Sequence, residues 1–316
     1  MSASSAALAA MLRAPASAQR SEVTEAPWSL DGLAGTLVGP RDPTRRGPAV
    51  LILAGSGPTD RDGNNLIGIR ADTYRLIADA LGHEGIRSLR YDKRGIGASQ
   101  AKAAREEDLR FEHFVEDAAA AANDLARRPE ISGVVLAGHS EGGLVALRAA
   151  GLAPVKGVVL LATPGRPFKD VLRAQFLAAS MPEAARVEAL RLLDRLSAGE
   201  FVTDVPALLA PLFRPSVQPY LASILTFDPA NEFARLKTPA LVVHGGRDLQ
   251  IDELDFAALT KARPDARVVR LPEANHVLKQ VPADLQANLA AYANPYLPLD
   301  PGLVPPIIEF VRSVAA

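Results

Sequence analysis

The chain has 316 residues, of which 48% are hydrophobic and 22% are charged, a composition that suits one large globular domain carrying an insertion. Its 35 basic and 36 acidic residues nearly cancel, and no cluster of Lys and Arg is interleaved with aromatic residues, so we expect no nucleic-acid partner and no binding to an anionic membrane. The absence of cysteine excludes disulfides, thiolate metal sites and a cysteine nucleophile, and no apolar stretch is long enough to span a bilayer.

The first residues, 1–22, differ in composition from the rest of the chain. They are rich in Ala and Ser, and Ala16-Ser17-Ala18 is similar to the end of a signal peptide. However, the apolar part is very short, Arg13 interrupts it, and no basic residue precedes it. We therefore interpret 1–22 as a disordered leader or the remnant of an export signal of a soluble protein, which leaves both the cytoplasm and the periplasm open.

From residue 23 onward, strand-like and helix-like segments alternate. Two predicted strands, 23–30 and 33–38, flank Asp31-Gly32, a dipeptide that is typical of a hairpin turn. The next predicted strands are 49–54, 86–91, 134–137 and 158–161, and the predicted helices are 72–83, 111–127 and the segment after residue 140. This alternation predicts an α/β fold with a mostly parallel central sheet and helices on both faces.

The alternation is interrupted between residues 166 and 236. Leu, Ala, Phe and Arg recur there at helical spacing, and several prolines divide the segment into short helices. Strands resume at 240–243 and 268–271, and a final helix is expected at 305–314. We therefore predict a core formed by 23–165 and 237–316, with 166–236 as a helical cap over the sheet edge where such folds bind ligands.

The predicted strand at 134–137 leads into Gly138-His139-Ser140-Glu141-Gly142, and an apolar helix-forming segment follows directly. A serine on such a strand-to-helix turn needs a strained backbone, and small neighbours such as Gly138 and Gly142 let the turn close. The pattern predicts that Ser140 is a nucleophile. The alternative is a glycine-rich structural turn with an inert serine, and the acid and base candidates below argue against it.

An acid and a base follow Ser140 in the order serine, acid, histidine. Asp248 comes directly after one predicted strand and His276 comes after the next, so both loops open at the same edge of the sheet as Ser140. Asp252 and Asp255 are alternatives to Asp248. They fall at the start of the following helix, where a carboxylate is commonly found for structural reasons.

Four of the five histidines compete with His276 for the role of base. His83 and His113 fall on predicted helices, where we expect surface or interface positions. His139 is next to the serine and points the other way, and His244 precedes the candidate acid instead of following it. We therefore assign the base to His276.

Transfer of an acyl group also requires N–H donors for the oxyanion that develops at the carbonyl. One should be the backbone N–H of Glu141, at the N-terminus of the helix that follows the serine. The second should come from the loop after the strand at 49–54, and we predict the N–H of Ser56, with Gly57 as the alternative. We interpret the charged residues 60–62 of this loop as a network that stiffens it, in preference to direct substrate contacts.

These motifs together resemble the α/β-hydrolase superfamily, in particular bacterial serine carboxylesterases with a helical cap. The residues that carry the resemblance are Gly138 to Gly142, the Asp248 loop, His276, the segment from Tyr91 to Ser99, and a Gly-Ser-Gly-Pro-Thr-Asp-Arg-Asp-Gly loop at 55–63. The resemblance runs from about residue 23 to the C-terminus and is weakest in the cap.

The resemblance implies that Ser140 is the nucleophile, His276 the base and Asp248 the acid that orients it, with no metal and no organic cofactor. It also implies that the segment from Tyr91 to Ser99 is a structural turn, in which Asp92 and Arg94 brace neighbouring loops. One departure is visible at residues 54–55, where Ala-Gly stands in place of the His-Gly of many members. The oxyanion loop is therefore expected to be built differently here.

We therefore predict hydrolysis of a small, hydrophobic ester through an acyl-enzyme. Five apolar side chains of the cap are candidates for lining the substrate site, and each suits the interior of the cap equally well: Phe176, Met181, Phe213, Tyr220 and Phe227. The same residues would serve an acyltransferase, thioesterase, lactonase or peptidase, and a non-catalytic ligand-binding protein is a further alternative. The oligomeric state is left open.

Overall fold

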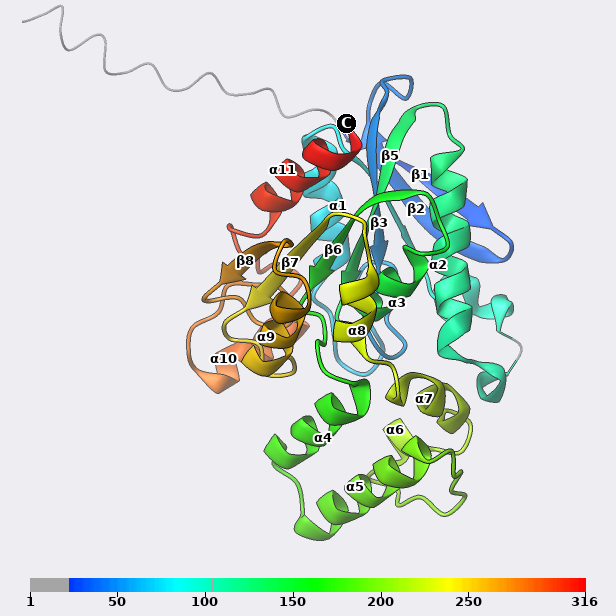
Figure 1. The fold of residues 1–316 in the computed structure, drawn as a ribbon, viewed down its shortest axis with the longest axis vertical. Helices are drawn as coiled ribbons and strands as arrows, with labels where there is room; N and C mark the ends of the chain where they lie inside the picture. Colours follow the sequence, from blue (N-terminus) through cyan, green and yellow to red (C-terminus); the bar gives the residue numbers. More distant parts are fainter. Residues whose placement is uncertain (1–22, 104) are drawn as a thin grey trace, which may run out of the picture.

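The computed structural model describes residues 23–103 and 105–316, so the predicted leader at 1–22 lies outside the described residues. The described part is built on one eight-stranded sheet with the strand order β1-β2-β4-β3-β5-β6-β7-β8 (Figure 1). The strands are β1 (Val23–Leu30), β2 (Leu33–Pro40), β3 (Gly47–Leu53), β4 (Arg87–Tyr91), β5 (Ile131–His139), β6 (Val155–Leu161), β7 (Ala240–Gly245) and β8 (Arg267–Leu271).

The sheet has an antiparallel edge and a parallel centre. β1 and β2 form the predicted hairpin, in which Asp31 and Gly32 have positive φ values of 46° and 80°, as a tight two-residue turn requires. β2 is also antiparallel to β4, whereas the pairs from β4 through β8 are parallel. The predicted fold class, a mostly parallel sheet covered by helices, is therefore confirmed.

The central strands are apolar along their length because helices cover both faces of the sheet. Val134, Val135 and Leu136 of β5, for example, are completely buried. One face packs against α1 (Thr73–His83) and α11 (Val304–Ala315) (Figure 1). The other face packs against α2 (Phe111–Ala126), α3 (Glu141–Ala149), α8 (Pro229–Arg235) and α9 (Glu253–Ala262).

Helices α4 to α7, which we call the cap helices, lie beyond the carboxyl ends of the parallel strands (Figure 1). They are α4 (Phe168–Ala178), α5 (Glu183–Ser197), α6 (Ala210–Phe213) and α7 (Gln218–Leu225). Their own interior is apolar, since Phe213 is completely buried and stacks on Phe176 with the ring centres 5.7 Å apart. After them, α8 packs against α3 and α9, which returns the chain to the sheet.

Two residues at the ends of α9 hold the chain where it leaves the sheet for the cap helices and where it comes back. Asp255, whose side chain is completely buried, accepts the backbone N–H groups of Gly165 (3.1 Å) and Arg166 (3.0 Å) and pairs with the Arg166 guanidinium (2.7 Å). At the other end of α9, Arg263 donates a hydrogen bond to the carbonyl oxygen of Leu236. Asp255 thus anchors the start of the cap segment, and Arg263 anchors the chain after α8, where it re-enters the sheet.

The remaining part of the chain runs from β8 through a long loop and α10 (Leu285–Ala290) to α11. Within residues 23–103 and 105–316, no helix has both the length and the apolar character needed to cross a bilayer.

We predict that Asp255→Ala lowers the free energy of unfolding by about 3 kcal/mol, because it leaves one buried and one partly buried N–H group unpaired and removes a buried partner of Arg166. Urea denaturation measures the change. Glu309→Ala is the control, since Glu309 is exposed and only contacts Arg267 at 3.4 Å, and it should cost less than about 1 kcal/mol. Equal losses for the two variants would contradict the assignment.

Candidate active site

Ser140 occupies the turn between β5 and α3 with φ 53° and ψ −124°, a conformation that a non-glycine residue rarely adopts. Two backbone hydrogen bonds hold it there. Its own N–H donates to the carbonyl of Leu161 at the end of β6 (2.8 Å), and its carbonyl accepts the N–H of Gly143 (2.9 Å). The predicted strained turn between strand and helix is present.

The two glycines of the turn are required by close contacts with backbone atoms. A Cβ atom on Gly138 would lie 2.1 Å from the carbonyl oxygen of Gly142, and a Cβ atom on Gly142 would lie 2.2 Å from the carbonyl oxygen of Leu53. Both distances are far shorter than a van der Waals contact. The turn is therefore packed directly onto the end of β3, which sets Ser140 beside the loop that follows this strand.

Asp248 and His276 meet at the same edge of the sheet. Asp248 follows β7, and its side chain is completely buried. One of its carboxylate oxygens accepts the Nδ1–H of His276 at 2.8 Å. The other oxygen accepts the backbone N–H groups of Gln250 (2.7 Å) and Ile251 (3.0 Å). Burial favours the neutral carboxyl group, but the electrostatic interaction with the imidazole of His276 and these hydrogen bonds outweigh it, so the pKa of Asp248 lies below its ordinary value.

Two competing carboxylates and three of the competing histidines have other surroundings, whereas His139, which was expected to point the other way, lines the same cavity as Ser140 and His276. Asp252 caps the N-terminus of α9, and Asp255 anchors the stem of the cap helices. His83 is exposed on α1, and His113 lies in the first turn of α2. His244 stacks on an aromatic ring of α9, with the ring centres 4.9 Å apart.

Ser140 and His276 line the same small cavity of about 80 Å³. No hydrogen bond joins the hydroxyl group of Ser140 to the imidazole ring of His276, both of which belong to the described part of the chain. Nδ1 of His276 is committed to Asp248. The other ring nitrogen, Nε2, is therefore the one left to act on a group in the cavity.

His139 makes two hydrogen bonds that the sequence did not predict. Its Nε2 lies 2.7 Å from the backbone carbonyl oxygen of His276, and its Nδ1 lies 2.8 Å from the hydroxyl group of Tyr74. Because a carbonyl oxygen only accepts, Nε2 must carry the hydrogen, and Nδ1 of the neutral ring then accepts from Tyr74. The Tyr74 oxygen in turn accepts the N–H of Gly55 at 2.9 Å. A chain of hydrogen bonds thus joins the loop after β3 to the backbone of His276.

The pKa values of these buried groups favour the same arrangement. Burial, together with the electrostatic interaction with the neighbouring His276 side chain, lowers the pKa of His139 to about 3, so this ring is neutral at ordinary pH. Burial raises the pKa of Tyr74, which keeps its hydroxyl group protonated as a donor. The hydrogen-bonded chain therefore has one direction, from Gly55 through Tyr74 and His139 to His276.

Lys93 fixes the other side of the same loop. Its ammonium group is buried and donates to the carbonyl oxygen of Gly55 at 2.5 Å. Burial lowers the pKa of Lys93. Because the peptide bond between Gly55 and Ser56 is trans, fixing the carbonyl of Gly55 also fixes the opposite direction for the N–H of Ser56.

The charged residues of the loop brace it against the sheet, as predicted. Arg61 pairs with Asp92 at 2.7 Å, and Asp62 pairs with an arginine of β4 at 2.7 Å. Arg94 forms two hydrogen bonds of 2.7 Å with Asp117 of α2. These ion pairs are structural, and they hold the loop after β3 and the segment after β4 in one arrangement.

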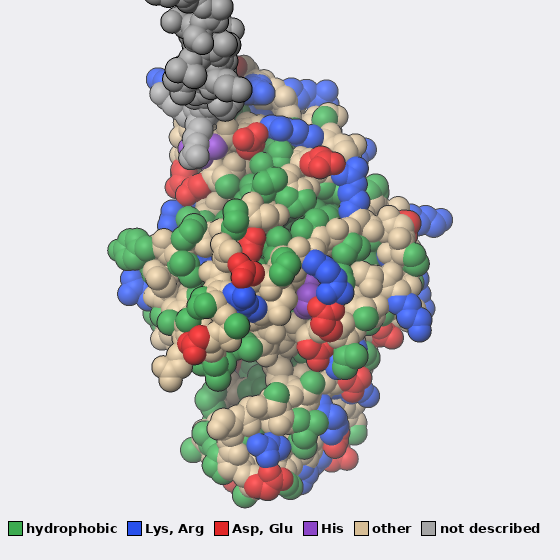
Figure 2. Space-filling view, turned by 90° about the vertical axis from the view of Figure 1, so that its left-hand side faces the viewer, with side chains coloured by type: hydrophobic (Ala, Val, Ile, Leu, Met, Phe, Trp, Pro, Cys, Tyr) green, Lys and Arg blue, Asp and Glu red, His purple; other side chains and the backbone are tan. Residues whose placement is uncertain are grey.

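A second, larger cavity of about 520 Å³ also reaches Ser140 and extends between the sheet and the cap helices. Figure 2 shows a hollow with apolar side chains between the main body and the cap. Ser56 and Glu141 line this cavity together with Ser140, and residues of α4, α6 and α7 form its outer wall. Ser140 therefore lies where a small and a large cavity meet.

Of the five cap residues predicted as lining candidates, Tyr220 lines the large cavity. Phe176 and Phe213 stack on each other inside the cap, and Phe227 packs on an aromatic ring of α2 with the centres 5.2 Å apart. Met181 is half-buried against the apolar core. Phe213 is completely buried, the other three are partly buried, and none of these four side chains lines the large cavity.

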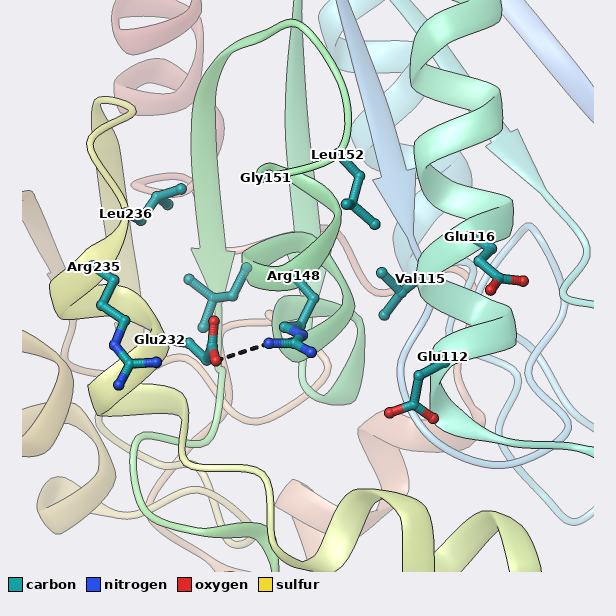
Figure 3. Close-up of a pocket in the computed structure, with 10 residues that line it drawn as sticks. Glu112, Val115, Glu116, Arg148, Gly151, Leu152, Glu232, Arg235 and Leu236 are labelled. Carbon is teal, nitrogen blue, oxygen red and sulfur yellow. Dashed lines mark hydrogen bonds and ion pairs between the residues drawn. The ribbon is translucent and has the colours of Figure 1, made fainter.

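A third cavity, of about 440 Å³, lies between α2, α3 and α8 (Figure 3). Neither Ser140 nor His276 lines it. An ion pair between Arg148 and Glu232 (2.9 Å) crosses it, and Glu112 and Glu116 stand on the α2 side. It contains no nucleophile next to a base. Among the residues that the structure describes, no group of three or more His, Asp or Glu side chains is arranged to hold a metal ion.

A family model described as the alpha/beta hydrolase family matches residues 50–285 of this chain. Esterase EstD from Thermotoga maritima is 31% identical over 259 residues, which cover 79% of this chain and 59% of that protein. The chain thus spans less than two thirds of the length of this relative.

Two solved structures show the same fold. An esterase from Pyrococcus furiosus has a TM-score of 0.56 at 16% identity, covering 94% of this chain and 92% of that one. Est1E from Butyrivibrio proteoclasticus has a TM-score of 0.53 at 17% identity, with 85% and 95% covered. At these identities the likeness concerns the fold alone. Together with the family model, it confirms the resemblance inferred from the motifs.

We predict that Gly138→Ala lowers the free energy of unfolding by more than about 3 kcal/mol, because the new methyl group would overlap the backbone of Gly142. Thermal or urea denaturation measures the loss. The matched control is Gly151→Ala, whose methyl group would lie at an ordinary contact distance of 3.5 Å from the carbonyl oxygen of Arg148. It should change stability by less than about 1 kcal/mol. A Gly138→Ala protein as stable as this control would show that the turn is not tightly packed.

A second prediction concerns pH. The unfolded chain protonates His139 near pH 6.5, whereas the folded protein keeps it neutral to about pH 3, so unfolding takes up a proton as the pH falls through this interval. The contribution of the neutral ring to stability is therefore complete above pH 6.5 and is lost progressively below it. His139→Gln keeps a donor and an acceptor and does not titrate. Between pH 7 and pH 4 the parent protein should lose about 3 kcal/mol more than this variant. Parallel losses in urea denaturation at the two pH values would contradict a neutral His139.

Proposed function

Because this chain belongs to the α/β-hydrolase family, we propose that it hydrolyses carboxylic esters through an acyl-enzyme formed on Ser140. The observation that carries the proposal is the arrangement at one cavity: a serine on a strained turn and a histidine hydrogen-bonded to a buried carboxylate both open into it. The name of the relative from Thermotoga maritima, an esterase, supports the same reaction.

In this proposal His276 is the base and Asp248 orients it. Asp248 is ionised and accepts the Nδ1–H of His276, which leaves the lone pair on Nε2 for the hydroxyl proton of Ser140. Asp248 also stabilises the imidazolium that forms when this proton is taken up. Hydrogen bonds of catalytic groups often form fully only with substrate bound, so we expect the contact between Ser140 and His276 to close when an ester occupies the cavity.

The reaction proceeds in two halves. In the first, Oγ of Ser140 attacks the ester carbonyl and gives its proton to His276, and the tetrahedral intermediate collapses as His276 returns the proton to the leaving alcohol. The products are an acylated serine and a free alcohol. In the second, His276 deprotonates a water molecule that attacks the acyl group, and the proton then returns to Ser140 as the carboxylic acid leaves.

Two backbone N–H groups are proposed to stabilise the oxyanion. Glu141 is the first residue of α3, so its N–H has no partner within the helix and lies next to the nucleophile. Ser56 supplies the second N–H, whose direction is set through the Gly55 carbonyl held by Lys93. The N–H of Gly55 is excluded from this role because it already donates to Tyr74.

Labelling with a fluorophosphonate tests the nucleophile, because such probes react with activated serines. We expect Ser140 to be labelled in the folded parent protein. Ser140→Ala should abolish the labelling and lower the hydrolysis of methyl butanoate, followed by titration of the released acid, by at least about 10³-fold.

The matched control is Ser29→Ala, which removes the hydroxyl group of an exposed serine on β1. It should leave both the labelling and the rate unchanged. A folded Ser140→Ala protein that still hydrolyses the ester at the parent rate, or a parent protein that is not labelled, would refute the proposed function.

A further inference from the structure

We infer from the two unequal cavities at Ser140 that the enzyme is specific for esters of a bulky apolar acid with a short alcohol. The inference rests on the proposed ester hydrolysis. It assigns the cavity of about 80 Å³ to the alcohol and the cavity of about 520 Å³ to the acyl group. The two cavities share Ser56, Ser140 and Gln250, so a carbonyl carbon next to Ser140 has access to both.

The position of His276 decides which cavity takes which half of the ester. The leaving alcohol must receive its proton from this imidazole, so the alkoxy oxygen has to lie beside it. His276 and Val277 line the small cavity, whereas neither of them lines the large one. The alcohol therefore leaves through the small cavity, and the acyl chain extends away from His276 under the cap helices.

The sizes of the two cavities set the length of each half. A closed protein cavity of about 150 Å³ accommodates benzene, which has six carbon atoms. By the same measure, about 80 Å³ suits an alcohol of about three carbon atoms or fewer, and about 520 Å³ suits an acyl group several times larger.

The walls of the small cavity are held together and cannot easily widen. Tyr74 is hydrogen-bonded on both sides, to Gly55 and to His139. The hydroxyl group of Thr73 donates to the carbonyl oxygen of Val277 at 3.0 Å, which joins two facing parts of the wall. Burial is nearly complete for Thr73 and Val277. The small cavity should therefore discriminate by size and not adapt to a longer alcohol.

The large cavity has an apolar outer wall. Phe168, Val171 and Leu172 of α4 face Leu212 and Leu221 of the neighbouring cap helices across it. Arg214 also lines this cavity, but its guanidinium is paired with Glu106, with an Nε to Oε2 distance of 2.9 Å. The wall therefore favours a neutral, hydrocarbon acyl chain.

A pair of isomeric esters tests the orientation directly. Methyl octanoate and heptyl acetate have the same atoms and the same ester bond, and they differ in which side carries the long chain. We expect kcat/KM for methyl octanoate to exceed that for heptyl acetate by at least about tenfold, because a heptyl group exceeds the small cavity by several carbon atoms. Titration of the released acid at constant pH measures both rates on the same scale.

Substitutions in the two walls test the assignment separately. Leu172→Trp fills the large cavity and should lower the ratio of kcat/KM for methyl octanoate to that for methyl propanoate by about tenfold. The control is Leu177→Trp on the same helix, where the side chain is exposed and outside the cavity. It should leave this ratio within about twofold.

Ile69→Ala enlarges the small cavity and should raise the ratio of kcat/KM for butyl octanoate to kcat/KM for methyl octanoate.

The outcomes separate this inference from the proposed function. If heptyl acetate is hydrolysed as fast as methyl octanoate or faster, the cavity assignment is wrong while ester hydrolysis stands. If Ser140 is labelled by a fluorophosphonate but neither ester is hydrolysed, the assignment is again wrong. If Ser140 is not labelled and no ester is hydrolysed, the proposed function fails and this inference fails with it.

Discussion

The hydrogen-bonded chain from Gly55 through Tyr74 and His139 to the carbonyl of His276 is the interaction on which the arrangement of the site depends. It crosses from the loop after β3 to the loop after β8 through His139, the residue that precedes Ser140. Every donor in it has one acceptor, and the neutral ring of His139 is what makes this possible. The loop of Ser56 and the loop of His276 are therefore linked to each other through hydrogen bonds.

The order of the strands explains why these loops meet. β3 and β6 lie on either side of β5, so the turn at Ser140 leaves the sheet between the loop of Ser56 and the end of β6. β7 and β8 follow next in the sheet and bring Asp248 and His276 to the same edge. Parallel strands end on one side, so residues from distant parts of the chain converge there without long loops. The cap helices lie beyond this edge and form the outer wall of the large cavity.

Features that depend on local backbone constraints could be predicted from the sequence. The turn around Ser140 needs glycines at fixed positions, the hairpin needs Asp31-Gly32, and the order of the strands implies a common edge for Asp248 and His276. The contacts of Tyr74 and Lys93 could not be predicted, because nothing in their neighbourhoods along the chain specifies which distant backbone group they meet. The lining of the large cavity could be predicted only in part: of the five candidates Tyr220 lines it, because aromatic and other apolar residues suit the interior of the cap as well as a cavity wall, and the packing of the helices decides between the two.

The segment that contains the cap helices is anchored at both of its ends to residues at the two ends of α9. Asp255 and Arg263 hold the chain at Gly165, Arg166 and Leu236, and the hydrogen bonds around His276 do not involve the segment in between. A different sequence grafted in place of α4 to α7, with α8 kept against α3 and α9, would leave the hydrogen bonds of His276 in place. Evolution can therefore replace the cap helices and change which molecules fit beside Ser140, while the hydrogen bond between Asp248 and His276 is kept.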